Sequence, residues 1–224
     1  MKVILFGATG MVGQGVLREC LLAPDVEEVL AVGRRATGQQ HEKLRELVHE
    51  NLSDYSSVED RLTGYDACFF CLGVSSAGMS EADYRRVTYD LALAAARTLV
   101  KLNPGMTFVF VSGSGTDSTG KSRSMWARVK GETENALLQL PFKAAYMFRP
   151  AYIHPMHGVT SRTRLYRAGY AVMGPLYPVL KALIPKYVTT SEQVGRAMLH
   201  VVRHGAPKRV LENADIDALE ATGP

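Results

Sequence analysis

The sequence has few cysteines and no long apolar segment. Only three cysteines occur among 224 residues, which argues against a small secreted domain held together by disulfides. A membrane-spanning helix needs roughly 18 or more apolar residues in succession, and the chain has no such run. The apolar run near the N-terminus is too short for a signal peptide. We therefore expect a cytoplasmic protein without a transmembrane helix.

Cys68 and Cys71 have the Cys-x-x-Cys spacing of some metal and redox sites, and Cys20 is the third cysteine. The pair lies in an apolar run, 66–72, that predicts a buried strand. Residues three apart on a strand face opposite sides and lie roughly 10 Å apart. A disulfide needs Cα atoms within about 7 Å. The sequence therefore predicts structural cysteines, and we expect no metal.

Acidic residues are absent from Asn135 to Ser191. The same stretch contains seven basic residues: Lys143, Arg149, Arg162, Arg164, Arg167, Lys181 and Lys186. No groove-reading motif or aromatic-studded basic sheet accompanies them, so we expect no nucleic-acid partner. An anionic cofactor, an anionic substrate or a membrane surface would each account for the positive charge.

Short apolar runs alternate with helical patterns along the chain, which predicts a parallel sheet covered by helices on both faces. The expected strands are Val3–Phe6, Glu28–Val32, Leu44–His49, Ala67–Leu72, Thr107–Ser112, Ala144–Phe148 and Arg209–Glu212. The expected helices are Met11–Leu22, Ser57–Leu62, Glu81–Leu102, Met125–Leu140 and Ser191–Arg203, the last beginning with a capping box of Thr189 and Glu192. The fold class is α/β: one Rossmann-type, doubly wound domain over 1–224. The irregular segment 158–188 is expected to form a small substrate region or lid.

The strongest motif is Gly7-Ala-Thr-Gly10-Met-Val-Gly13, between an apolar strand and a helix. The first glycine permits a tight turn, the second a close approach to a pyrophosphate, and the third close packing of the helix on the sheet. The helix N-terminus offers free N–H groups to the phosphates. We expect Thr9, Met11 and Val12 to line a dinucleotide together with the glycines.

The second expected strand ends in Gly33-Arg34-Arg35. Sites that prefer NAD place an Asp or Glu there for the ribose 2′-hydroxyl, whereas an Arg accommodates a 2′-phosphate. A guanidinium offers paired, charge-assisted hydrogen bonds to phosphate. Arg34 and Arg35 therefore predict NADP(H) in preference to NAD(H), the alternative being a solvated turn.

Over nearly its whole length the chain resembles the short-chain dehydrogenase/reductase superfamily, and most of all its atypical, epimerase/dehydratase-like members of the Tat-interacting oxidoreductase subgroup. The matching stretches are residues 7–13, Cys-Leu-Gly (71–73), Val-Ser-Gly-Ser-Gly (111–115), Arg-Val-Lys-Gly-Glu-x-Glu (128–134) and Phe-Arg-Pro (148–150). The resemblance implies further cofactor contacts, at Asn51 and Leu52 near the adenine and at Cys71, Leu72, Gly73, Lys130 and Pro150.

The resemblance also implies a catalytic set: a Ser after the fifth strand, and a Tyr four residues before a Lys. The Lys holds the nicotinamide ribose and lowers the Tyr pKa, the Tyr exchanges a proton with the substrate, and the Ser stabilises the oxyanion. Lys130 is present, and Ser114 fits the serine role better than Ser112. Trp126 stands where the Tyr is expected, and an indole accepts no proton. Thr88 also replaces an Asp typical of the subgroup.

Three interpretations follow from this departure. In the first, the protein is an oxidoreductase whose proton comes from Ser124, Tyr152, His154 or solvent, and its small-molecule partner is anionic or quinone- or flavin-like. In the second, it binds NADP(H) without turnover and acts through a partner. In the third, the segment from Arg162 to Val188 lies on a membrane surface. By analogy with relatives, the helix Glu81–Leu102 is also a candidate contact in a homodimer.

Overall fold

The computed structural model describes residues 1–157 and 177–221. Seven parallel strands form the central sheet in the order β3-β2-β1-β4-β5-β6-β9. Their bounds are β1 Lys2–Phe6, β2 Glu28–Gly33, β3 Leu44–Val48, β4 Ala67–Phe70, β5 Thr107–Val111, β6 Ala144–Arg149 and β9 Val210–Glu212. The doubly wound α/β fold is confirmed. Strand order reverses between β1 and β4, which makes the carboxyl ends of these two strands the expected ligand crevice.

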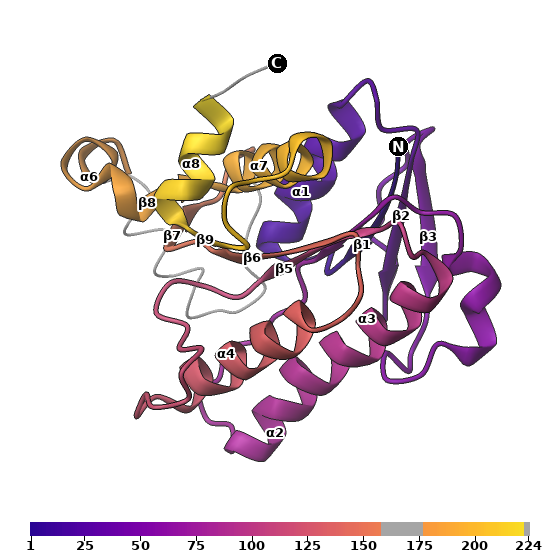
Figure 1. Ribbon diagram of the computed structural model, residues 1–224. Coiled ribbons are helices and arrows are strands. Elements are labelled where there is room, and N and C mark those ends of the chain that lie inside the picture. Colours follow the sequence, from indigo (N-terminus) through magenta and orange to yellow (C-terminus); the bar gives the residue numbers. More distant parts are fainter. Residues whose placement is uncertain (158–176, 222–224) are drawn as a thin grey trace.

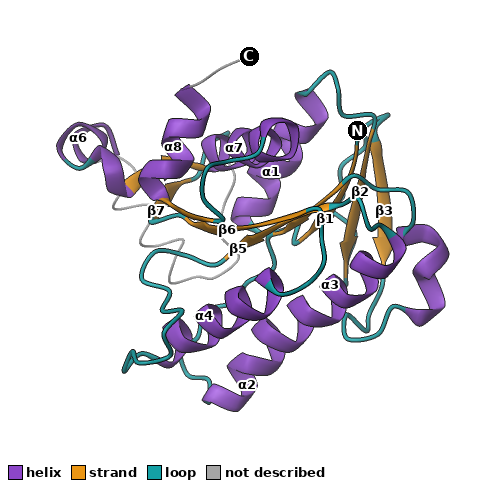
Figure 2. Cartoon of the chain, in the orientation of Figure 1, coloured by secondary structure: helices purple, strands orange, loops and turns teal. Residues whose placement is uncertain are grey.

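Helices cover both faces of the sheet (Figures 1 and 2). Above it in Figure 1 lie α1 Met11–Leu22, α7 Ser191–His204 and α8 Asn213–Ala221. Below it lie α2 Glu81–Arg85, α3 Leu91–Leu102 and α4 Met125–Leu138. Each layer encloses its own apolar core. Strand residues alternate between the two cores: Val3 and Leu5 pack toward α1 and α7, and Ile4 and Phe6 toward α3.

Helices α1 and α7 approach each other at backbone distance. A Cβ added to Gly15 would lie 2.5 Å from the Ser191 Cβ, and one added to Gly195 would lie 3.1 Å from the Val16 Cα. Two glycines therefore allow these helices to approach closely, with the Glu19 side chain packed against Gly195. Ion pairs join the same two helices, since Arg18 contacts Glu192 at 3.1 Å and Arg196 contacts the buried Glu19 at 3.5 Å.

The described chain differs from the expected elements in several places. The segment 81–102 is interrupted by a π-helical turn, η2 Arg86–Asp90, and the segment near 57–62 is a 3₁₀ helix, η1 Ser56–Leu62. The capping box of α7 consists of Thr190 and Gln193, one residue later than predicted. Thr189 lies one residue before the N-cap, within β8 Val188–Thr190, which pairs with β7 Tyr152–His154. This two-stranded sheet and α8 were missed.

Most of the predicted substrate segment, 158–176, lies outside the described residues, and so do Arg162, Arg164 and Arg167. Its described remainder contains α6 Tyr177–Leu183 and the 3₁₀ turn η3 Pro185–Tyr187. In the part of the chain that the structure describes, we find no helix with the length and apolar character of a membrane span. All three cysteines are free, and Cys68 and Cys71 face opposite cores.

Candidate functional site

The glycine turn connects β1 to α1 at the point where strand order reverses. Gly7 has φ +80°, and a Cβ there would lie 2.7 Å from the Cys71 carbonyl carbon at the end of β4. Gly10 N–H donates to the Gly7 carbonyl at 2.8 Å and closes the turn. A Cβ on Gly13 would lie 2.0 Å from the Gly7 oxygen. Close backbone packing therefore requires the first and third glycines, as predicted.

The N-terminus of α1 faces this crevice without a side-chain cap. Gly10 is the N-cap residue, and no side chain in the described part of the chain accepts a hydrogen bond from the first turn. The first turn also contains no acidic residue. Unpaired N–H groups and the helix dipole favour an anion at this position. The turn therefore fits the phosphates of a dinucleotide.

A pocket of about 330 Å³ opens beside the turn. Its lining comes from the glycine turn, the end of β2 and the loops after β3 and β4: Gly7, Ala8, Thr9, Ala31, Val32, Gly33, Arg34, Arg35, Thr37, Leu52 and Leu72. The structure thus brings Leu52 and Leu72 together with the glycine turn. Asn51 is exposed, and its side chain accepts a hydrogen bond from the Ser53 N–H at 3.1 Å within its own loop. Gly73 is exposed beyond the lining residues.

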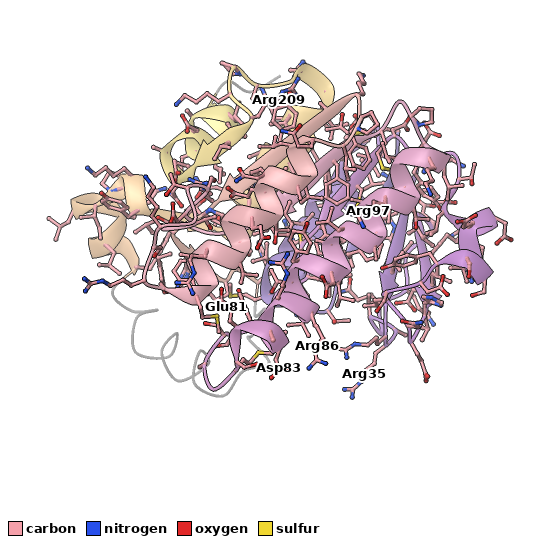
Figure 3. The ribbon with its side chains drawn as sticks, turned by 60° about the horizontal axis from the view of Figure 1, so that its bottom comes forward. Arg35, Glu81, Asp83, Arg86, Arg97 and Arg209 are labelled. Carbon is pink, nitrogen blue, oxygen red and sulfur yellow. The ribbon has the colours of Figure 1, made fainter. Side chains whose placement is uncertain are left out.

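Arg34 and Arg35 are both exposed at the mouth of this pocket. Figure 3 shows Arg35 projecting from the body of the protein at the end of β2. The loop that follows Arg34 and Arg35 is bound to the neighbouring strand, because the Thr37 N–H donates to the Glu46 carboxylate on β3 at 2.5 Å. Sequence reasoning missed Glu46. The pairing that places it beside Ala31 joins two separate strands and leaves no local pattern in the sequence.

A second cluster lies at the carboxyl ends of β5 and β6. Lys130 on α4 donates a hydrogen bond to the Ser112 carbonyl oxygen, and the Ser114 N–H donates to the Pro150 carbonyl at 2.9 Å. A Cβ added to Gly113 would meet both the Lys130 ammonium, at 3.8 Å, and the Pro150 oxygen, at 4.0 Å. Lys130, Pro150 and the serine loop are therefore neighbours, as the resemblance implies.

The two candidate serines have different surroundings. Ser114 is exposed on its loop. Ser112 is buried, and its hydroxyl donates to the Glu134 carboxylate at 2.5 Å. A hydroxyl already engaged in this way is poorly placed to stabilise a substrate oxyanion. The geometry therefore favours Ser114 for that role.

Trp126 lies in the first turn of α4, one turn before Lys130. Its ring covers the serine loop, since a Cβ on Gly115 would lie 3.3 Å from the far edge of the indole. Thr88, the other departure from the subgroup, is buried in the π-helical turn η2. π-helical turns within α-helices are frequent at functional sites. Both departures thus lie on helices of the lower layer, α4 and the α2–α3 segment, which pack together.

The charge on Lys130 depends on two opposing effects. Burial lowers the pKa of Lys130 from 10.5 to about 8, while the nearby Glu134 carboxylate raises it. Glu134 has no exposed surface and forms a bidentate ion pair with Arg149, at 2.5 and 2.9 Å. Sequence reasoning missed this ion pair, although Glu134 follows Lys130 by one helical turn and Arg149 belongs to the Phe-Arg-Pro motif.

His154 belongs to the small sheet, on β7. Its ring stacks on Tyr177 of α6 with centroids 4.1 Å apart. Its Nδ1 atom is buried and has no hydrogen-bond partner within residues 1–157 and 177–221, and burial lowers the His154 pKa. Burial also raises the pKa of Tyr152. Of the other proton donors considered, Ser124 is half-buried and is the N-cap residue of α4.

The model of the NAD dependent epimerase/dehydratase family matches residues 3–138, from β1 to the end of α4. The chain belongs to this family. The match covers the glycine turn, the end of β4 and the Lys130 helix. The chain is therefore a nicotinamide-cofactor-binding member of the atypical short-chain dehydrogenase/reductase group, as the resemblance implied.

Two relatives show how similar this chain is to other proteins in sequence. Protein fmp52, mitochondrial, of Emericella nidulans is 28% identical over 89% of this chain and 86% of that protein. Protein HTATIP2 of Rattus norvegicus is 28% identical over 68% of this chain and 62% of that protein. Further fungal relatives are also named as mitochondrial. These names contradict our expectation of a cytoplasmic protein, which rested only on the short apolar run at the N-terminus and the few cysteines.

Solved structures share the fold. Gre2 of Candida albicans in complex with NADPH superposes with a TM-score of 0.70 at 13% identity, over 95% of this chain and 78% of that one. The enzyme WbmF of Bordetella bronchiseptica in complex with NAD+ gives a TM-score of 0.67 at 15% identity, over 97% and 76%. Neighbours with either nicotinamide cofactor therefore have this architecture.

Proposed function

We propose that this protein binds NADP(H) in preference to NAD(H) and is an oxidoreductase for a small anionic, quinone-like or flavin-like molecule. The observation that carries the proposal is the pocket at the end of β2, where Arg34 and Arg35 lie beside the glycine turn. The pocket-lining residues include no Asp or Glu to accept hydrogen bonds from a ribose 2′-hydroxyl. Two guanidinium groups instead suit a 2′-phosphate.

In this proposal the free N–H groups at the start of α1 bind the pyrophosphate, and Lys130 holds the nicotinamide ribose. The bound nicotinamide supplies or accepts a hydride. Ser114 donates a hydrogen bond to the substrate oxygen, and the indole of Trp126 forms an apolar wall that excludes water. Because Trp126 accepts no proton, acceptors that need little acid assistance from the protein are the favoured substrates.

The experiment is calorimetric titration of the purified protein with NADPH and with NADH, followed by a turnover assay. The assay offers quinones, flavins and aldehydes as acceptors and compares the wild type with Gly10→Ala. We expect tighter binding of NADPH, and oxidation of NADPH that disappears in the variant. Tighter binding of NADH would refute the role of the arginines, and no binding of either nucleotide would refute the site.

A second candidate function rests on Trp126 and Thr88. An epimerase/dehydratase-family protein that keeps Lys130 and the glycine turn but lacks the phenol is suited to bind NADP(H) and signal its presence to a partner. Cofactor binding without turnover of any acceptor in the same assay would favour this function over the first. The fungal relatives' names support a mitochondrial location for either function.

A further inference from the structure

A network of polar side chains is buried beneath the Lys130 end of the site. At its centre the Glu134 carboxylate has no exposed surface. Arg149 donates to both of its oxygens, Ser112 donates to Oε1 at 2.5 Å and Ser118 to Oε2 at 3.0 Å. Arg149 also reaches Glu212 on β9 at 3.0 Å. Burial of a carboxylate is tolerated only with such complete pairing, so the network fixes these groups relative to one another.

Ser112 joins this network to Lys130. Ser112 donates its hydroxyl proton to Glu134 and accepts a hydrogen bond from Lys130 at its main-chain oxygen. Glu134 and Lys130 are also one turn apart on α4 and share a helix face. Glu134 therefore helps to fix the residue whose carbonyl group holds the ammonium.

Few other charges act on Lys130. Arg149 is neutralised by Glu134 and Glu212. On α2, which packs against α4, Glu81 pairs with Arg128 and Arg85 pairs with Glu132, both toward solvent. Among the residues that the structure describes, Glu134 is the charged group that raises the Lys130 pKa.

We propose that Glu134 is a positioning residue that keeps Lys130 charged and in place, and thereby sets the pH range over which the site binds its cofactor. The inference rests on the proposed function, since it concerns the nicotinamide-ribose end of the same site. Arg149 and Ser112 contribute to this role indirectly, because their hydrogen bonds hold the Glu134 carboxylate in position.

The direction of the effect follows from the opposing influences on Lys130. Burial favours the neutral amine, and the Glu134 carboxylate favours the ammonium. In the wild type the ammonium is lost as the pH rises through about 8, and cofactor affinity falls over the same interval. Removing the carboxylate charge leaves burial unopposed, so the midpoint of this fall moves to lower pH.

The test is the dissociation constant for NADPH, measured by fluorescence from about pH 6 to about pH 9.5, in wild type and in Glu134→Gln. We expect the midpoint to fall by at least about half a pH unit. Glu132→Gln is the matched control, because it removes a carboxylate two residues away that pairs with Arg85 at the surface. Its midpoint should equal that of the wild type. Glu134→Asp retains the charge, so its midpoint should lie close to that of the wild type.

Each outcome decides between distinct claims. Absence of NADPH binding in the wild type refutes the proposed function, whatever the variants do. Binding with the same midpoint in folded Glu134→Gln and wild type refutes the role of Glu134 alone. If Glu134→Gln does not fold, Ser112→Ala removes the link without removing a buried charge, and we expect about threefold weaker NADPH binding. Unchanged affinity in that variant would overturn the proposal.

Discussion

The two ends of the cofactor site are built in different ways. The phosphate end is made of main chain: Gly7 and Gly13 pack at backbone distance, and uncapped N–H groups face the crevice. The other end depends on side chains, with Lys130 held by Ser112 above the buried Glu134–Arg149 pair. The main chain of the first end tolerates little added volume, and its charged side chains, Arg34 and Arg35, lie exposed at the mouth of the pocket. The second is sensitive to single charges and protons.

The sharpest way to break the phosphate end is one added methyl group. Gly13→Ala places a Cβ 2.0 Å from the Gly7 oxygen, so we expect a loss of about 3 kcal/mol or more in the free energy of unfolding. Gly10→Ala adds the same group at 3.3 Å from that oxygen, and its stability should stay close to that of the wild type. Urea denaturation measures both. Equal losses would show that the turn is not held by backbone contact at Gly13.

Arg34 and Arg35 test the charge at the phosphate end. Replacing both with Ala should weaken NADPH binding about tenfold or more and leave NADH binding unchanged, because only NADPH has the 2′-phosphate. Arg97→Ala, at an exposed arginine on α3 (Figure 3), is the control for general loss of positive charge. Titration calorimetry of the wild type and both variants with each nucleotide gives the six affinities. An equal loss for both nucleotides would assign the pair to general attraction of the pyrophosphate.

The Lys130 end should show a conflict between stability and binding. The folded-state pKa of Lys130 is about 8, against 10.5 when the side chain is solvated. Its destabilising contribution is therefore complete below pH 8 and disappears as the pH rises to 10.5. Lys130→Met should raise the free energy of unfolding at pH 7 by about 1–3 kcal/mol, while weakening NADPH binding. A gain that persists at about pH 10.5 would instead indicate better packing of the methionine.

Trp126→Tyr gives the smallest expected effect. It restores a phenol one turn before Lys130, where a proton donor would assist carbonyl reduction. We expect no more than about a tenfold increase in the rate of aldehyde reduction, because Thr88 remains as a second departure from the subgroup. Trp126→Phe is the control that removes the indole without adding a hydroxyl. No difference between the two variants would show that substrate geometry has diverged as well as the proton donor.

Local patterns predicted the parts of the fold that depend on local chemistry. The apolar runs identified all seven strands of the sheet, and α1 begins and ends where predicted. The glycine spacing predicted the turn that Gly7 and Gly13 form. Contacts between distant segments carry no such signal: the Glu134–Arg149 pair joins residues fifteen positions apart across α4 and β6. The π-helical turn at Arg86–Asp90 was equally hidden, because a single inserted residue hardly alters the apolar period.

The contact of Gly15 with Ser191 has a consequence for how the molecule moves. Ser191 begins α7 directly after β8, which pairs with the strand that contains His154. Through Gly15, the same residue touches the helix whose first turn faces the crevice. Ser191 therefore contacts the nucleotide-binding helix and directly follows the small sheet, and we expect a molecule that displaces β8 to shift α1 as well.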